Sequence, residues 1–220
     1  MTQEIDFETF LFISNNKYQI FVYDKDSLKN LYNKETKIVD TIDLENLSNF
    51  LDENIYKIEK KINNFIKNII LIIEDKKILD VSISLKKKNY EKYLDQKHLE
   101  NSLVEVKNVF RENYQDQIIM HMIIVSEVNK NDDYLFLEVN FISIPNSLTF
   151  YFDKLLENHQ IKISRYMSGN YIKSYFGEAE TELSMMANKL NNGLNNSEVQ
   201  LVSKSIENKG FFEKFFQLFS

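Results

Sequence analysis

The chain has 220 residues, of which 43% are hydrophobic, so it can bury one large core or two small ones and is not a disordered protein. Its formal net charge of -6 argues against a nucleic-acid binder, because such proteins rely on a basic face. The absence of cysteine excludes disulfides, thiolate metal sites and cysteine nucleophiles, and it fits a cytoplasmic protein.

Neither a secretory signal nor a membrane-spanning helix is expected. Glu4, Asp6 and Glu8 occupy the region where a signal peptide carries positive charge. The apolar runs also fall far short of the ~20 residues that a helix needs to span a bilayer.

The first forty residues predict a meander of three strands. Residues 7–14 and 17–23 form two of them, joined at Asn15 and Asn16, because asparagine tolerates the left-handed backbone of a tight hairpin turn. A polar turn then leads to a third strand, which is expected between residues 28 and 39.

Residues 36–74 predict a strand, a crossover helix and a buried strand. The run at 69–73 is too short for a helix and is typical of a strand that is buried on both faces. This order indicates an α/β layer. One helical face is apolar at spacings of three and four: Leu44, Leu47, Leu51, Ile55, Ile58, Ile62, Phe65 and Ile66.

The middle of the chain predicts an inserted α+β module over residues 95–165. It follows an alternating strand at 78–85 and begins with a helix at 96–113. A hairpin, a third helix and a further strand complete it. The apolar stripe of its first helix is Leu99, Leu103, Val106 and Phe110. On the first hairpin strand we expect Ile118, Met120, Met122 and Ile124 on a buried face and His121 on the other.

The last fifty residues predict two helices, a linker and an amphipathic tail. The helices are expected at 171–176 and 179–190, and polar composition with weak periodicity predicts a linker over 193–208. In the tail, residues 209–220, one arc of the helix is entirely apolar, and the other side is polar. The apolar arc is Phe211, Phe212, Phe215, Phe216, Leu218 and Phe219.

Two interpretations of this tail stay open. A short helix with an aromatic face can lie in the membrane interface. The same helix can instead dock on the core of its own chain or on a partner. Few lysines flank the arc, so membrane binding would depend mainly on buried aromatic area.

Few residues point to enzymatic chemistry. His98, His121 and His159 stand on separate elements without metal-ligand spacing, and His121 is interpreted as a structural histidine satisfied by a neighbour. No serine lies in a nucleophile elbow, and four glycines provide no phosphate loop. We therefore expect no enzyme activity, no catalytic residue, no cofactor and no metal.

The order of elements resembles the N-terminal half of FtsA, the actin-like bacterial division protein. The segment 37–44 resembles the strand–turn–helix of that family, and the run 69–73 its buried strand. Residues 118–121 resemble the start of its inserted subdomain, and 197–220 its linker and membrane-targeting helix. The resemblance implies an actin/ribonuclease-H-like subdomain over 1–94 and 166–192, with a small strand-helix-strand-strand subdomain inserted.

The resemblance breaks at the phosphate loop. That family carries an Asp-x-Gly turn between its first two strands, which would fall at Ile13, Ser14, Asn15 and Asn16, and both the Asp and the Gly are absent. The second phosphate loop belongs to a second domain, for which the 220 residues leave no room. The expected function is therefore a scaffold without ATP.

The resemblance implies a peripheral protein on the inner face of the cytoplasmic membrane that links division proteins to it. Its tail would bind the membrane surface, its partners would be FtsZ or late septal proteins, and self-association is possible. Nucleic acid is not an expected partner. The hairpin loop of the inserted subdomain is the candidate partner-binding site: Asn129, Lys130, Asn131, Asp132 and Asp133.

Three alternatives stay open at this point. One is an actin-like pilus-assembly platform of the PilM type. Another is a soluble interaction module whose Phe-rich tail docks on a partner. The last is a degenerate ATPase that a partner completes in trans.

Overall fold

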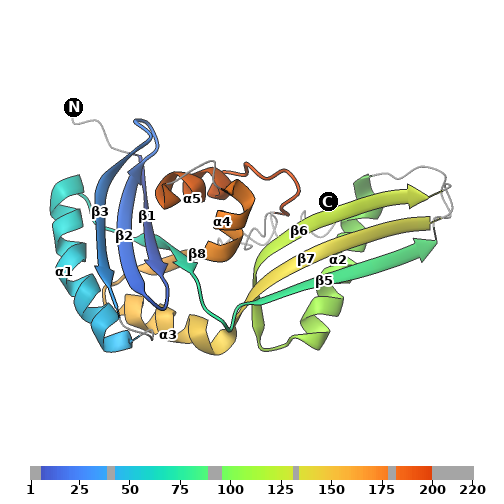
Figure 1. Cartoon of the computed structure of the whole chain (residues 1–220), viewed down its shortest axis with the longest axis horizontal. Helices are drawn as coiled ribbons and strands as arrows, with labels where there is room; N and C mark the ends of the chain where they lie inside the picture. Colours follow the sequence, from blue (N-terminus) through green and yellow to red (C-terminus); the bar gives the residue numbers. More distant parts are fainter. Residues whose placement is uncertain (1–5, 39–42, 89–95, 131–133, 178–181, 200–220) are drawn as a thin grey trace, which may run out of the picture.

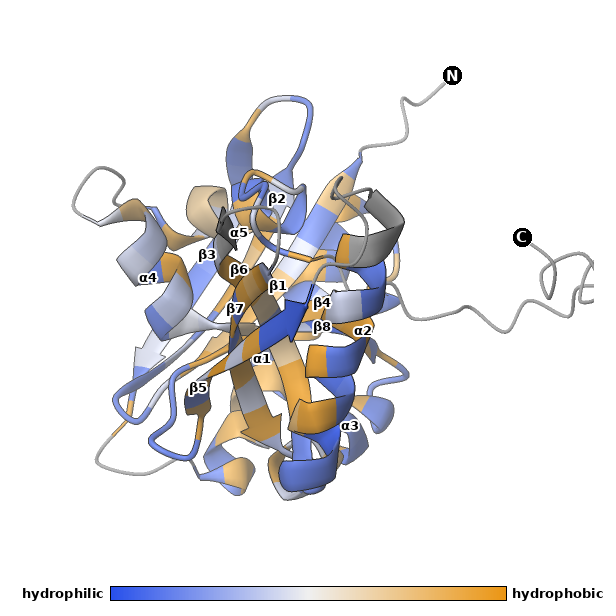
Figure 2. Ribbon diagram, turned by 90° about the vertical axis from the view of Figure 1, so that its right-hand side faces the viewer, coloured by the Kyte–Doolittle hydropathy of each residue, from blue (hydrophilic) through white to orange (hydrophobic). Residues whose placement is uncertain are grey.

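The computed structural model describes residues 6–38, 43–88, 96–130, 134–177 and 182–199. They form two sheets at opposite ends of an elongated molecule (Figure 1). The large sheet has the strand order β3-β2-β1-β4-β8, and the small sheet has the order β5-β7-β6. The inner strands of both sheets carry most of the hydrophobic residues, whereas the edge strand β3 and the turns are largely hydrophilic (Figure 2). The mixed α/β class is confirmed.

The predicted meander is present as β1 (Phe7–Ile13), β2 (Lys17–Asp24) and β3 (Lys29–Lys37). Both pairings are antiparallel. β1 and β2 are mostly buried because they lie inside the sheet, whereas β3 is mostly exposed at its edge. The meander forms one half of the large core.

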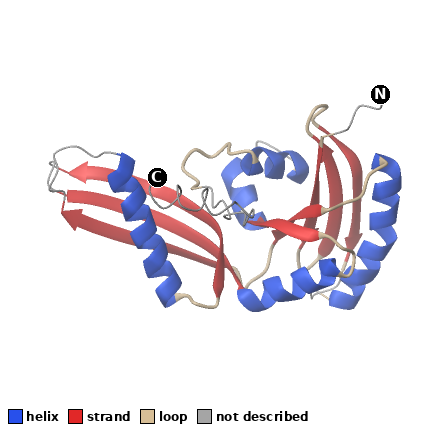
Figure 3. Cartoon of the chain, turned by 180° about the vertical axis from the view of Figure 1, so that it is seen from behind, coloured by secondary structure: helices blue, strands red, loops and turns tan. Residues whose placement is uncertain are grey.

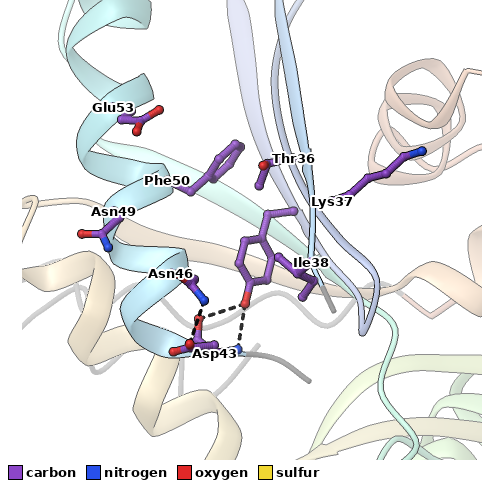
Figure 4. A pocket seen from close by; sticks show the side chains of 9 residues that line it. Thr36, Lys37, Ile38, Asp43, Asn46, Asn49, Phe50 and Glu53 are labelled. Atoms are coloured by element: carbon purple, nitrogen blue, oxygen red, sulfur yellow. Dashed lines mark hydrogen bonds between the residues drawn. The ribbon is translucent and has the colours of Figure 1, made fainter. Parts of the chain in front are cut away.

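Helix α1 (Leu44–Ile62) lies on one side of the meander, and α5 lies on the other (Figure 1). The first turn of α1 is capped by Asp43, whose carboxylate accepts a hydrogen bond from the backbone N–H of Glu45 at 2.9 Å. The Tyr18 hydroxyl donates to the Asp43 carbonyl at 2.9 Å and accepts from its N–H at 2.8 Å. These bonds fix the start of α1 beside a cavity of about 470 Å³ (Figure 4).

The predicted apolar stripe of α1 is only partly correct. Six of the eight residues are buried: Leu47, Leu51, Ile55, Ile58 and Ile62 on the helix, and Ile66 beyond its end. Leu44 and Phe65 were wrongly included, because both are exposed, Phe65 to 73%. The helix ends at Ile62, and Asn63 adopts the left-handed conformation with φ 52°, so Phe65 no longer follows the helical period.

Strand β4 (Asn68–Ile73) is the centre of the large sheet. It pairs in parallel with β1 on one side and with β8 (Lys162–Ser168) on the other. Every residue of β4 after Asn68 is buried, as the continuous apolar run predicted. After β8 come α4 (Gly169–Phe176) and α5 (Leu183–Asn191).

The small sheet contains β5 (Leu79–Lys88), β6 (Gln117–Lys130) and β7 (Tyr134–Pro145). Helix α2 (Gln96–Asn113) lies against one of its faces (Figure 3). Its predicted stripe packs into a second core, where the rings of Phe110 and Phe141 stack with centroids 4.6 Å apart. Val106, Met122, Leu137 and Val139 complete this buried cluster.

The predicted boundaries of the inserted module, 95–165, were wrong. β5 pairs with β7, so it belongs to the small sheet, and β8 pairs with β4, so it belongs to the large one. Helix α3 (Asn146–Glu157) packs on β8 as well as β7. The inserted sheet and its helix therefore extend from residue 79 to residue 145.

The predicted faces of β6 also need correction. A β-bulge between Ile119 and His121 breaks the alternation, so that Met120 joins the large core while Met122 joins the small one. His121 is fully buried, and Ile118 is 38% exposed. Among the described helices, none is both long and apolar enough to cross a bilayer.

Candidate functional site

Two adjoining cavities form a groove where the two sheets meet. The smaller, about 250 Å³, lies beside the β1–β2 turn, and the larger, about 500 Å³, lies between α4 and the small sheet. They share Asp75, Lys76 and Asn170, so we treat them as one feature and call it the junction groove. Asp80 and Asn140 line it from the small sheet.

The β1–β2 turn at the mouth of the groove is held by hydrogen bonds between its own residues. The Ser14 N–H donates to the Lys17 carbonyl at 3.0 Å, and the Lys17 N–H donates to Ser14 Oγ at 3.2 Å. The Ser14 hydroxyl in turn donates to Asn16 Oδ1 at 2.7 Å. These backbone and side-chain donors are therefore already used within the turn.

At the floor of the groove, the side chain of Glu74 lies close to the backbone of Gly169. Glu74 forms an ion pair with Lys173 on α4. A Cβ atom at position 169 would lie 2.6 Å from Cγ of Glu74, so a residue without a side chain is needed at the start of α4. Among the described residues, no group of three or more acidic, histidine or cysteine side chains is placed to hold a metal ion.

A buried polar cluster joins the two sheets behind the groove. The Glu198 side chain is 5% exposed, and its Oε1 accepts from Arg165 of β8 at 2.7 Å. The same oxygen lies 2.8 Å from Nδ1 of His121 on β6. Its other oxygen accepts from the Tyr171 hydroxyl at 3.3 Å, and Asn195 donates to that hydroxyl at 2.7 Å. We call these five residues the Glu198 cluster.

The hydrogen bonds fix the protonation of His121. The Ser168 N–H donates to its Nε2 at 2.9 Å, so the ring proton must lie on Nδ1, from which it donates to Glu198. Burial lowers the pKa of His121, so the ring is neutral. Burial would raise the pKa of Glu198, but hydrogen bonding to His121 and the charge of Arg165 outweigh it, and that pKa is lowered.

Residues 197–199 pair with the edge of the small sheet through an isolated β-bridge. The Ile124 N–H donates to the Ser197 carbonyl and the Val199 N–H to the Met122 carbonyl, both at 2.8 Å. Ile123 and Glu198 form an antiparallel bridge between these bonds. The predicted linker over 193–208 is therefore wrong in this part, because backbone pairing and a buried carboxylate hold it in place.

No family model matches the sequence, and no curated protein matches it either. Solved structures do match. The PilM-PilN type IV pilus biogenesis complex superposes with a TM-score of 0.53 at 8% identity, over 78% of this chain and 50% of that one. The fold is actin-like.

Two further actin-like structures match with lower scores. The cytoplasmic domain of EpsL, an inner membrane component of the type II secretion system of Vibrio cholerae, has a TM-score of 0.39 at 10% identity and covers 74% of this chain and 56% of its own. A Bacteroides thetaiotaomicron protein of actin-like ATPase fold and unknown function has a TM-score of 0.35 at 14% identity. The match covers 79% of this chain and 57% of that protein. This chain thus spans between 50% and 57% of these three structures.

The predicted membrane-binding residues of the tail lie outside the described residues. So do Asn131, Asp132 and Asp133 of the predicted partner loop. Asn129 and Lys130 end β6, opposite Leu135 and Tyr134. This end of the small sheet is the one farthest from the large sheet (Figure 1), so Asn129 and Lys130 are not part of the junction groove.

The interpretation of His121 as a buried histidine satisfied by neighbours is confirmed, because both ring nitrogens are hydrogen-bonded. Glu198, which pairs with His121, could not be predicted as its partner. Glu198 lies 77 positions away in a polar stretch, and no periodicity marks it. The only available signal was that a histidine in an apolar strand requires a buried partner.

Proposed function

We propose that this chain is a non-enzymatic, actin-like scaffold that binds a partner protein in the junction groove at the inner face of the cytoplasmic membrane. The observation that carries the proposal is the chemistry of the groove. Its mouth is a turn in which the N–H groups of Ser14 and Lys17 and the Ser14 hydroxyl are already paired, and its walls offer carboxylates and amides.

This chemistry is unfavourable for a nucleotide. A phosphate site needs free backbone N–H groups and close glycine approach, and the Ser14 and Lys17 N–H groups are bonded within the turn. Asp75 and Asp80 would also repel a triphosphate, with Lys76 as the nearby cation. The absence of the Asp-x-Gly motif has the same consequence.

A polypeptide suits the same surface better. The amide side chains of Asn140 and Asn170 can both donate and accept hydrogen bonds, as an extended peptide backbone requires. The carboxylates of Asp75 and Asp80 favour a basic residue in that peptide. The PilM structure that shares this fold was solved as a complex with PilN, which supports the idea that the fold can hold a protein partner.

Membrane attachment is assigned to the tail. Five phenylalanines and one leucine in one arc of residues 211–219 would bury apolar area in the interface. The partner in the FtsA-like form of this proposal is FtsZ or a late septal protein. A pilus-assembly role of the PilM type is the second candidate, and the superposition on the PilM complex favours it.

The experiment is localisation of a fluorescent fusion of the full chain, compared with a fusion that lacks residues 211–220. The full chain is expected at the membrane, at mid-cell for a division role or at pilus sites for a pilus role. The truncated chain is expected in the cytoplasm. Equal distribution of both fusions would refute the tether.

The non-enzymatic part of the proposal is tested separately by calorimetry. With ATP and Mg²⁺ we expect no binding tighter than about 100 μM, which corresponds to about −5.5 kcal/mol. Tighter binding would overturn this part and would favour an ATPase that a partner completes.

A further inference from the structure

We infer that residues 195–199 form a latch through which the chain that follows Val199 controls the shape of the junction groove. The inference rests on the proposed role of that groove. The latch lies where the small sheet, the large sheet and α4 contact the same short segment.

The latch holds both sheets at once. Its backbone pairs with β6 through Ser197 and Val199, which fixes it to the small sheet. Its Glu198 side chain binds Arg165 of β8, which fixes it to the large sheet. The Glu198 side chain is 5% exposed, so water cannot easily reach its carboxylate, whereas the Arg165 side chain is 24% exposed. A displaced latch would therefore remove one of the contacts between the two sheets, and the sheets would stay joined by Met120 in the large core and by the Ser168–His121 hydrogen bond.

The latch and the groove share wall residues. Ile123, Ser168 and Tyr171 line the larger cavity. Ile123 bridges to Glu198, and Tyr171 donates to its carboxylate. Ser168 is linked to Glu198 through His121. Ser168 and Tyr171 stand on the side of the large sheet, whereas Ile123, Asp80 and Asn140 belong to the small sheet, so a change in the latch moves the first wall relative to the second.

The amphipathic tail follows the latch closely in the sequence, so it can act on the latch. Phe211, the first apolar residue of the tail arc, follows Val199 by twelve positions. Twelve residues span at most about 40 Å when fully extended. A tail held at a membrane or on a partner would therefore keep Val199 within about 40 Å of the point of attachment, and it would load the latch only when that length is used up.

The first readout is hydrogen exchange of the full chain, measured without partner or membrane. Tyr171→Phe removes one hydroxyl from the cluster, Glu198→Gln removes its charge, and Glu112→Gln is a matched control on the exposed face of α2. In both latch variants we expect residues 122–124 to exchange about fivefold faster or more. We also expect faster exchange at residues 75–80, which line the groove but do not contact the latch.

The second readout is the distance between the sheets. The chain has no cysteine, so spin labels can be placed at Lys34→Cys on β3 and Ser84→Cys on β5, both exposed. In the latch variants the distance distribution is expected to shift or broaden, whereas Glu112→Gln leaves it unchanged.

Faster exchange confined to 122–124 and 195–199, with an unchanged distance, would overturn the inference. If Glu198→Gln does not fold, Tyr171→Phe decides, and its failure to change either readout would also overturn the inference. Neither readout depends on membrane or partner, so the latch can fail while the proposed function stands.

Discussion

Replacing Glu198 tests the most consequential contact that the structure reveals. Glu198→Ala leaves Arg165 without its carboxylate and the Nδ1–H of His121 without an acceptor. Tyr171 loses an acceptor as well. All of these losses occur at a side chain that is 5% exposed, so water cannot compensate for them as it would on the surface.

The expected magnitude follows from this burial. Removing one partner of a buried ion pair costs about 3–5 kcal/mol, and we expect Glu198→Ala to lower the free energy of unfolding by that amount. Glu198→Gln keeps an acceptor for His121 and loses only the charge, so we expect about 1.5–3 kcal/mol. An exposed control, Glu112→Gln, should change it by less than about 0.5 kcal/mol.

The assay is urea denaturation of the full chain at pH 7.5, followed by circular dichroism. The predicted order of stability is wild type and Glu112→Gln, then Glu198→Gln, then Glu198→Ala. If Glu198→Ala behaves like the control, residues 195–199 contribute nothing to the junction, and the linker interpretation of this part of the chain is restored.

Three further predictions concern the pH dependence of stability, the packing of Gly169 and the loop at residues 129–133. Because the pKa of His121 is lowered, its neutral form stabilises the fold fully above its unfolded pKa of about 6.5, and stability falls as the pH drops below that value. The lowered pKa of Glu198 adds a further loss below pH 4.5, and denaturation curves between pH 7.5 and 5 should show a shallower slope for His121→Gln than for wild type. Gly169→Ala should cost about 1–3 kcal/mol in a thermal or urea melt because its Cβ would overlap Glu74, and a melt equal to wild type would contradict this packing. Residues 129–133 are the alternative partner contact: with the partner in the junction groove, serine substitutions there should leave recruitment in pull-down assays unchanged, and weakened recruitment with an unchanged melt would place the contact on this loop instead.

The local patterns in the sequence were sufficient for most elements. The meander, the helix that begins at Leu44 and the buried strand β4 each carry their own periodicity, so short-range spacing predicts them. The helix end was missed because a single left-handed residue, Asn63, stops it while the apolar spacing continues to Phe65.

Sheet membership could not be predicted in the same way. β8 resembles any short apolar strand, and only its parallel pairing with β4, nearly a hundred residues earlier, places it in the large sheet. β5 alternates because one of its faces is exposed, which is compatible with either sheet. The same limit hid the role of Glu198, because its partners are contributed by distant strands and its neighbours are polar.

The central claim, a scaffold tethered to the membrane, is tested most directly by liposome flotation of the full chain. Each phenylalanine of the arc contributes about 1.5–3 kcal/mol when buried. Phe215→Glu places a charge in the middle of the arc, and Gln217→Glu places the same charge on the polar side as a matched control. We predict that wild type and Gln217→Glu float with the liposomes, and that Phe215→Glu does not. If wild type fails to float and Phe215→Glu lowers the melting temperature instead, the tail docks on its own protein, and the tether is refuted.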